Sequence, residues 1–194
     1  MEFSRIKILA IALLIESIAL ILAFLLAGYF DISLFPLTAN LFRDILIGTL
    51  AAFPPFALFV FSLSEKAEKF PVIGSLRKVM ITDIKAIFSN TRFFDLVLIS
   101  LLAGFAEEIL FRGIIQYKFG IIIASILFGL VHFVTPAYAV IAVIMGFYIG
   151  IFFHIFESLL IPIHLHFIYD LGALIYLKYF VTSEPGCDTL REDY

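Results

Sequence analysis

Apolar runs of the length needed to cross a bilayer limit most strongly how this chain can fold. A helix needs about 20 apolar residues to cross the hydrocarbon core. Six stretches come near this length, roughly Ile8–Tyr29, Ile45–Leu63, Phe93–Gln116, Gly120–Val134, Ala137–Phe156 and Leu159–Phe180. The chain is 63% hydrophobic and only 15% charged, which excludes an ordinary soluble domain. The sequence therefore predicts an all-α, polytopic membrane bundle of about six transmembrane helices.

Residues 65–90, between the second and third apolar stretches, follow a different pattern. Five basic residues there alternate with apolar residues at helical spacing, which predicts an amphipathic helix at the membrane surface. Basic segments favour the cytoplasmic side of a membrane. Together with Arg5 and Lys7, this helix predicts that its side of the bundle faces the cytoplasm. Six spans then place both termini there.

The organisation of the chain is that of one integral membrane domain over residues 1–194, because no soluble domain or internal repeat is recognisable. Residues 183–194 form a polar C-terminal tail that contains the single cysteine, Cys187. One cysteine permits no disulfide within the chain and no thiolate metal site. No basic patch interleaved with aromatic residues is present, so nucleic acid is not an expected partner. Membrane lipids are expected partners.

Three charged residues lie close together inside the third apolar stretch: Glu107, Glu108 and Arg112. A carboxylate in the middle of a bilayer costs about 3 kcal/mol or more unless it is paired or hydrated. Glu108 and Arg112 are four residues apart, so they share a helix face and can form an ion pair. Glu107 points about 100° away and has no local cation, which makes it the candidate for proton transfer. The alternative is an ion network that only holds helices together.

Two of the four histidines complete a candidate site. His132 lies in the fourth apolar stretch, and His166 lies in the sixth, four residues before Asp170 on the same helix face. An acid and two imidazoles from three different stretches could converge on one point. There they could activate a water molecule opposite donors that stabilise an oxyanion. Glu107, His132 and His166 could instead bind zinc, which carboxylate and imidazole groups suit.

Other polar and small residues in the apolar stretches have less specific interpretations. For His154 and His164 we expect packing or interfacial roles. Glu16, in the first stretch, is either a hydrogen-bonded structural acid or a residue that lines a site. The four-residue spacing of Gly146 and Gly150 lets helices approach closely, and we expect it to serve packing inside the bundle rather than homodimerisation.

Three motifs occur in a fixed order along the second half of the chain. They are Glu107-Glu108-x-x-x-Arg112, Phe128-x-x-x-His132 and His166-x-x-x-Asp170. In this order the chain resembles the CPBP (Abi) family of intramembrane endopeptidases, which includes the type II CAAX prenyl proteases. The resemblance covers residues 93–180, the expected catalytic core.

The resemblance implies an all-helical intramembrane protease whose site opens toward the cytoplasm. It implies that Glu107 activates water with His132 as its partner, and that the glutamate mechanism needs no metal. It also implies a supporting ion pair and an oxyanion-stabilising pair. These pairs are Glu108 with Arg112, and His166 with Asp170.

Asp170 differs from the asparagine that the prenyl proteases of this family often have at that position. An ionised aspartate cannot donate a hydrogen bond to an oxyanion. Three alternatives follow: Asp170 is protonated, it orients His166, or it binds a metal.

The expected function is hydrolysis of a peptide bond in a membrane-associated peptide or protein, prenylated or not, in the plasma membrane of a prokaryote. No cofactor is expected. A zinc-dependent metalloprotease that uses Glu107, His132 and His166 is the nearest alternative. A non-catalytic immunity or scaffold protein is another, and Glu16 together with the acid–histidine set leaves a transporter or proton relay open.

Overall fold

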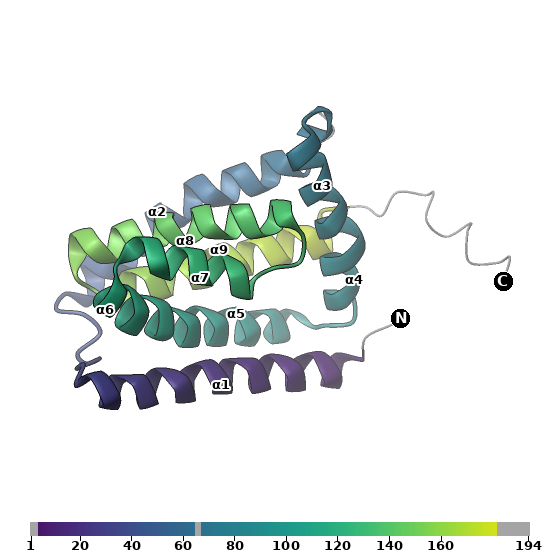
Figure 1. Ribbon diagram of the computed structural model, residues 1–194. Helices are drawn as coiled ribbons and strands as arrows, with labels where there is room; N and C mark the ends of the chain where they lie inside the picture. The colour runs from purple at the N-terminus through teal and green to yellow at the C-terminus, as the bar shows by residue number, and fades with distance from the viewer. Residues whose placement is uncertain (1–3, 65–66, 182–194) are drawn as a thin grey trace, which may run out of the picture.

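The computed structural model describes residues 4–64 and 67–181, and this part of the chain is a bundle of helices without a β-strand (Figure 1). The prediction of an all-α fold is therefore confirmed. The polar tail predicted at 183–194, with Cys187, lies outside the described residues. The longer helices are α1 (Arg5–Phe30), α2 (Leu41–Ser62), α5 (Phe93–Glu108), α7 (Ile121–Val131), α8 (Pro136–Phe156) and α9 (Leu160–Tyr179).

Within the described residues, four helices, α1, α2, α8 and α9, are long and apolar enough to cross a membrane, and they mark an integral membrane protein. The third predicted span is also helical throughout. It runs without a break through α5, the π-helical segment η3 (Ile109–Gln116) and the short α6 (Tyr117–Phe119).

The fourth predicted span, Gly120–Val134, is corrected by the structure. Its helix, α7, ends at Val131 after 11 residues. That length is only about 17 Å at 1.5 Å per residue, against a hydrocarbon core of about 30 Å. A turn follows at His132, and Pro136 opens α8 from the Thr135 N-cap. The end of the helix carries the buried Phe128 and, as its C-cap, His132.

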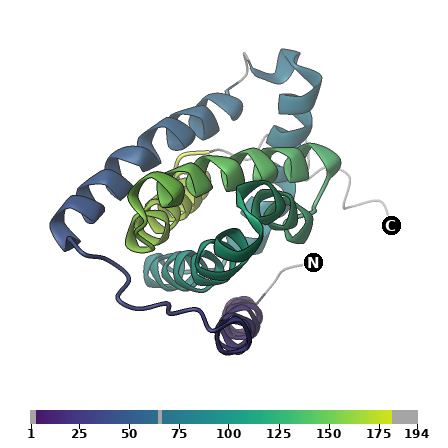
Figure 2. The same ribbon diagram turned by 60° about the vertical axis from the view of Figure 1, so that its left-hand side comes forward.

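The packing order of the helices places α9 near the middle of the bundle. It packs against α2 on one side and against α5 on another, while α7 packs on α8. Helix α1 lies along α5 and η3 and covers them from outside (Figures 1 and 2). Residues such as Ile18 and Leu25 on the outer face of α1 are exposed, as expected of a surface that meets lipid.

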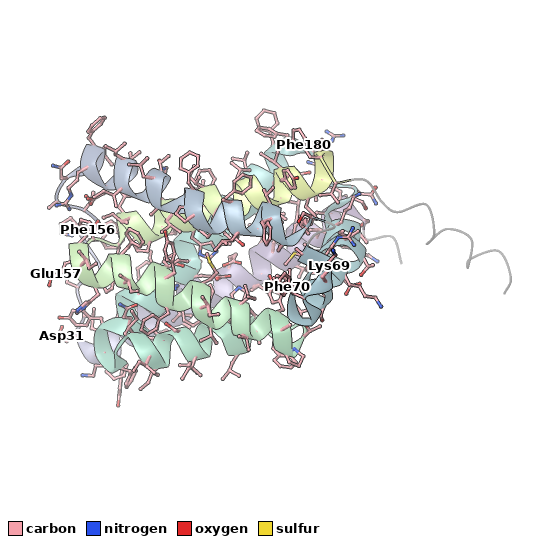
Figure 3. All side chains as sticks on the ribbon, turned by 90° about the horizontal axis from the view of Figure 1, so that it is seen from above. Asp31, Lys69, Phe70, Phe156, Glu157 and Phe180 are labelled. Atoms are coloured by element: carbon pink, nitrogen blue, oxygen red, sulfur yellow. The ribbon has the colours of Figure 1, made fainter. Side chains whose placement is uncertain are left out.

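Charged residues concentrate at the two ends of the bundle, with Asp31 and Glu157 at one end and Lys69 at the other (Figure 3). At the Lys69 end, Arg5 pairs with Asp95 through its Nε, 2.6 Å from Oδ2. The Lys178 ammonium there donates to backbone carbonyls, with Ser89 at 2.9 Å. These contacts hold the start of α1, the start of α5 and the end of α9 together.

The predicted amphipathic helix crosses this end of the bundle. It is continuous through α3 (Pro71–Val79), the π segment η2 (Met80–Ile84) and α4 (Lys85–Phe88), and it lies steeply inclined to the long helices (Figure 1). A short 3-10 turn, η1 (Ala67–Lys69), precedes it. The orientation of this end toward the cytoplasm stays a prediction.

Candidate active site

The buried ion pair of the third helix forms the base of the site. Arg112 donates from one terminal nitrogen to Glu108 Oε1 at 2.8 Å and from the other to the carbonyl of Gly146 at 2.9 Å. Its guanidinium carbon also lies 4.8 Å from the centre of the Phe128 ring. Glu108 is 0% exposed and Arg112 is 1% exposed. The i,i+4 pair expected from the sequence is thus present in the interior.

The backbone changes from α- to π-helical geometry directly after Glu108. The π segment runs from Ile109 to Gln116 and carries Arg112. Segments of π-helix are rare and occur frequently at functional sites. Nothing in the sequence pattern indicated this one.

Gly146 and Gly150 serve packing inside the bundle, which confirms the prediction made for their spacing. A Cβ on Gly146 would lie 3.1 Å from the Cα of Ser125 on α7. A Cβ on Gly150 would lie 2.6 Å from Oε1 of Gln116, whose Nε2 donates to the Gly150 carbonyl at 2.8 Å. Close approach of α8 therefore gives the buried polar groups of η3 their backbone acceptors.

His166 joins the ion pair from the neighbouring helix α9. Its Nδ1 lies 2.7 Å from Glu108 Oε1, and its Nε2 lies 3.3 Å from Asp170 Oδ2. The contact depends on Gly104, where a Cβ would lie 3.0 Å from both the Ile163 carbonyl and the Phe167 nitrogen. A larger residue there would push α5 and α9 apart. The sequence predicted Arg112 as the partner of Glu108 and did not predict His166 as a second partner.

Glu107 and His132 form the second half of the site. Oε2 of Glu107 lies 3.5 Å from Nε2 of His132, and this oxygen is buried with no hydrogen-bond partner in the described part of the chain. Nδ1 of His132 lies 2.8 Å from the Phe128 carbonyl, and since a carbonyl only accepts, Nδ1 carries the proton. The imidazole also stacks on the Phe128 ring, with centroids 4.4 Å apart. Its Nε2 lone pair is therefore aimed toward Glu107.

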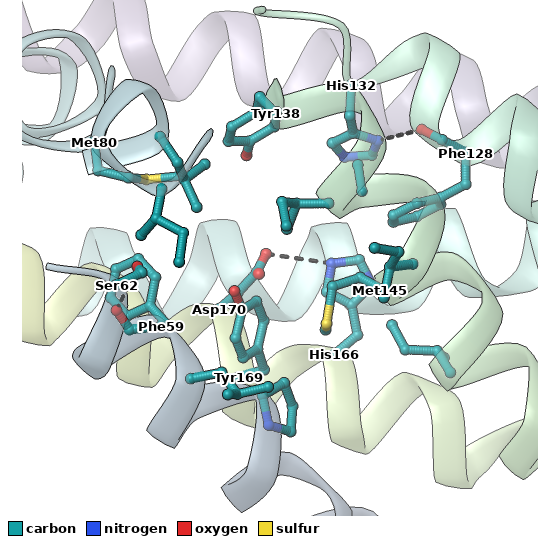
Figure 4. A pocket seen from close by; sticks show the side chains of 18 of the residues that line it. Phe59, Ser62, Met80, Phe128, His132, Tyr138, Met145, His166, Tyr169 and Asp170 are labelled. Carbon is teal, nitrogen blue, oxygen red and sulfur yellow. Dashed lines mark hydrogen bonds and ion pairs between the residues drawn. The ribbon is translucent and has the colours of Figure 1, made fainter. Parts of the chain in front are cut away.

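A cavity of about 390 Å³ opens beside these groups (Figure 4). His132, His166 and Asp170 line one part of it, whereas most of its wall is apolar. The apolar wall comes from α2, α3, η2 and α8 and includes Phe59, Leu76, Met80 and Met145. Glu107 is not among the lining residues and reaches the cavity through its contact with His132.

The remaining sequence candidates do not line this cavity. His164 Nε2 is 2.9 Å from Thr49 Oγ1, an interhelical contact of the kind expected for packing. His154 is exposed and lies with Glu157 at a second, more polar pocket at the opposite end. Glu16 is 9% exposed, and its Oε2 is buried with no hydrogen-bond partner among the described residues.

Two tyrosines that the sequence analysis did not select, Tyr138 and Tyr169, also line the cavity. Tyr169 directly precedes Asp170, and this adjacency was the only sequence signal that pointed to it. Tyr138 lies in the first turn of α8, six residues after His132. It carries no sequence signal because its position depends on how the chain turns between α7 and α8.

The three zinc ligands considered from the sequence, Glu107, His132 and His166, already face other side chains in this arrangement. Among the described residues, no three His, Cys, Asp or Glu side chains come together in a way that could hold a metal ion. The reason lies in His166, because both of its ring nitrogens already face carboxylates. Glu107 and His132 alone are too few ligands for a typical zinc site, which has at least three from the protein.

The fold and this site define an integral membrane helical protein with a buried acid–histidine centre at an apolar cavity. The family described as "Type II CAAX prenyl endopeptidase Rce1-like" matches residues 89–172, the segment that contains all three motifs. The resemblance inferred from the motifs is thus confirmed over this segment, which is similar to that family.

The chain also matches a curated protein over less than half of its length. The chain is 33% identical over 89 residues to "Uncharacterized protein YpbD" of Bacillus subtilis (strain 168), a match that covers 44% of this chain and 47% of that protein. The match therefore spans about half the length of that relative. No solved structure matches the chain significantly.

Proposed function

We propose that this protein is an intramembrane endopeptidase in which Glu107 and His132 activate water for attack on a peptide bond. The observation that carries the proposal is the 3.5 Å gap between Glu107 Oε2 and His132 Nε2 at the wall of an apolar cavity. That gap is too long for a direct hydrogen bond, and polar groups at such separations are commonly bridged by water. Membership of this segment in an endopeptidase family supports the reaction type.

The reaction follows from the hydrogen-bonding capacity of the two side chains. A water that donates one proton to His132 Nε2 and the other to Glu107 has its oxygen lone pair free to attack a carbonyl carbon. Glu107 takes the proton as the new C–O bond forms, and returns it to the amine when the C–N bond breaks. The bond from His132 Nδ1 to the Phe128 carbonyl keeps Nε2 available as the acceptor.

The charge network supports this reaction by fixing the walls of the site. Glu108 bonds to Arg112 on η3 and to His166 on α9, and these contacts fix the position of α9 relative to α5 and η3. Of the three roles left open for Asp170, orientation of His166 agrees best with their separation of 3.3 Å. Catalytic groups on rigid elements keep their geometry better than groups on loops.

The cavity favours a substrate with an apolar chain next to the scissile bond. Its wall is mostly aromatic, aliphatic and methionine side chains, and part of it belongs to the interfacial helix formed by α3 and η2. A peptide held at the membrane surface by a hydrophobic segment or an attached lipid could enter there. We infer from the basic residues of α3 and α4 that this end faces the cytoplasm, in the plasma membrane of a prokaryote.

We also propose that the reaction uses no resident metal, since His166 has no free nitrogen for one. Protein purified from metal-supplemented medium should hold well under one zinc per chain by elemental analysis. Its cleavage rate should be unchanged after dialysis against a chelator. Activity that disappears with the chelator and returns with zinc would instead support the metalloprotease.

The function is tested with an internally quenched peptide that carries a farnesylated C-terminal CAAX sequence, presented to the purified protein in liposomes. Glu107→Ala should lower the cleavage rate by roughly 100- to 10,000-fold, the usual contribution of acid–base groups, without unfolding the protein. His164→Ala is the matched control, because it removes an interhelical histidine outside the cavity. Equal turnover by the wild type and Glu107→Ala would refute the assignment, and no cleavage by the wild type would favour a non-catalytic protein.

A further inference from the structure

The motif residues leave the oxyanion side of the proposed reaction without a free hydrogen-bond donor. Both ring nitrogens of His166 face carboxylates, at 2.7 Å and 3.3 Å. Asp170 as a carboxylate can only accept, and it would repel an oxyanion that formed beside it. Arg112 is fully buried and does not line the cavity. A donor must therefore come from another residue of the cavity wall.

Two phenolic hydroxyl groups are available on that wall. The hydroxyls of Tyr138 and Tyr169 have no hydrogen-bond partner in the described part of the chain, whereas the Ser62 hydroxyl donates to the Phe59 carbonyl at 2.7 Å. A phenol keeps its proton at neutral pH and can donate it in a hydrogen bond. Tyrosine hydroxyls are among the side-chain donors known to stabilise oxyanions.

Tyr138 is better placed of the two. Tyr138 lines the cavity together with His132 and Asp170, one from each half of the site. Its hydroxyl points into the cavity toward the side of Asp170 (Figure 4). The ring of Tyr169, by contrast, packs edge-on against Phe59.

The local structure explains how Tyr138 reaches this place. Helix α7 ends at Val131 with His132 as its C-cap, and α8 begins at Pro136 with Thr135 as its N-cap. The Tyr138 amide donates to the Thr135 hydroxyl at 3.3 Å, which fixes the first turn of α8. The short connection therefore brings Tyr138 to the cavity that His132 also lines, and the two side chains lie next to each other (Figure 4).

We propose that Tyr138 is a further catalytic residue whose phenolic O–H donates a hydrogen bond to the oxyanion formed from the substrate carbonyl. This rests on the peptidase function proposed above. When water adds to the carbonyl carbon, the π electrons move to oxygen and Glu107 takes the proton. Tyr138 stabilises that oxygen without giving up its own proton. The hydrogen bond weakens again as the C–N bond breaks and the carboxylate product forms.

The test compares Tyr138→Phe with Tyr179→Phe, which removes the hydroxyl of an exposed tyrosine outside the cavity. With the farnesylated reporter peptide in liposomes, Tyr138→Phe should lower kcat about 100-fold and change KM less than about twofold, as is usual for the loss of one oxyanion donor. Tyr179→Phe should keep kcat within about threefold. Both variants should unfold at the wild-type temperature.

A second measurement separates oxyanion binding from general disturbance of the cavity. A phosphinic analogue of the reporter peptide mimics the anionic tetrahedral intermediate, so its Ki should rise for Tyr138→Phe by about the factor lost in kcat/KM, with product affinity unchanged. Unchanged kcat, or losses of product affinity and thermal stability in proportion to kcat, would overturn the role of Tyr138. If Glu107 stays essential in that case, the proposed function survives, whereas a wild type that cleaves nothing refutes both.

Discussion

Replacing Arg112 by methionine removes one charge from the buried network while keeping a long, unbranched side chain. The substitution deletes the 2.8 Å bond to Glu108 Oε1, the 2.9 Å bond to the Gly146 carbonyl and the cation over the Phe128 ring. Glu108, which is 0% exposed, then has only His166 as a partner. The buried Glu108 carboxylate thus loses one of its two charged partners.

The expected loss of stability follows from the cost of breaking buried ion pairs. Removing one partner of such a pair typically costs about 3–5 kcal/mol, because the other charge is left buried. His166 continues to face Glu108 at 2.7 Å, so we expect the lower part of this range, about 3–4 kcal/mol. At about 2–4 °C per kcal/mol for a chain of this size, the unfolding temperature should fall by roughly 6–16 °C.

The assay is thermal unfolding in detergent, followed by far-ultraviolet circular dichroism at one protein and detergent concentration. The double variant Glu108→Gln/Arg112→Met removes both charges and should be more stable than Arg112→Met alone. An Arg112→Met protein that unfolds within about 2 °C of the wild type would refute the reasoning. A double variant whose loss equals the sum of the two single losses would refute it as well, since independent sites add.

Two further predictions concern glycines where helices approach closely. Gly129→Ala places a Cβ 2.8 Å from the Ala139 carbonyl and should lower the free energy of unfolding by about 1–3 kcal/mol, measured by thermal unfolding. The control Gly28→Ala has nothing within 4 Å of the new Cβ and should leave the free energy of unfolding unchanged or raise it by up to about 1 kcal/mol. Equal effects of the two substitutions would contradict the packing argument. Gly104→Ala should push α5 from α9 and lengthen the contact of His166 with Glu108, lowering kcat at least about tenfold in the reporter assay; wild-type kcat would show that the contact does not position the site.

The features that the sequence predicted correctly depend on local spacing. The run lengths of apolar residues predicted helices, and the four-residue spacing of Glu108 and Arg112 predicted their pairing. The fourth apolar stretch is helical as predicted but ends earlier, because hydropathy does not register where a helix stops. The chain stays apolar to Val134, but the helix ends before the turn that leads into Pro136.

The sequence alone determined the class of fold and which residue types lie in the membrane, because apolar length and helical period are properties of neighbouring residues. Only the tertiary structure decided that Glu108 is shared by Arg112 and His166, and that Tyr138 faces the cavity beside His132. These contacts depend on how closely α5 and α9 approach at Gly104 and on where α8 turns back over α7. Such distances are set by packing between segments far apart in the chain, which no local pattern specifies.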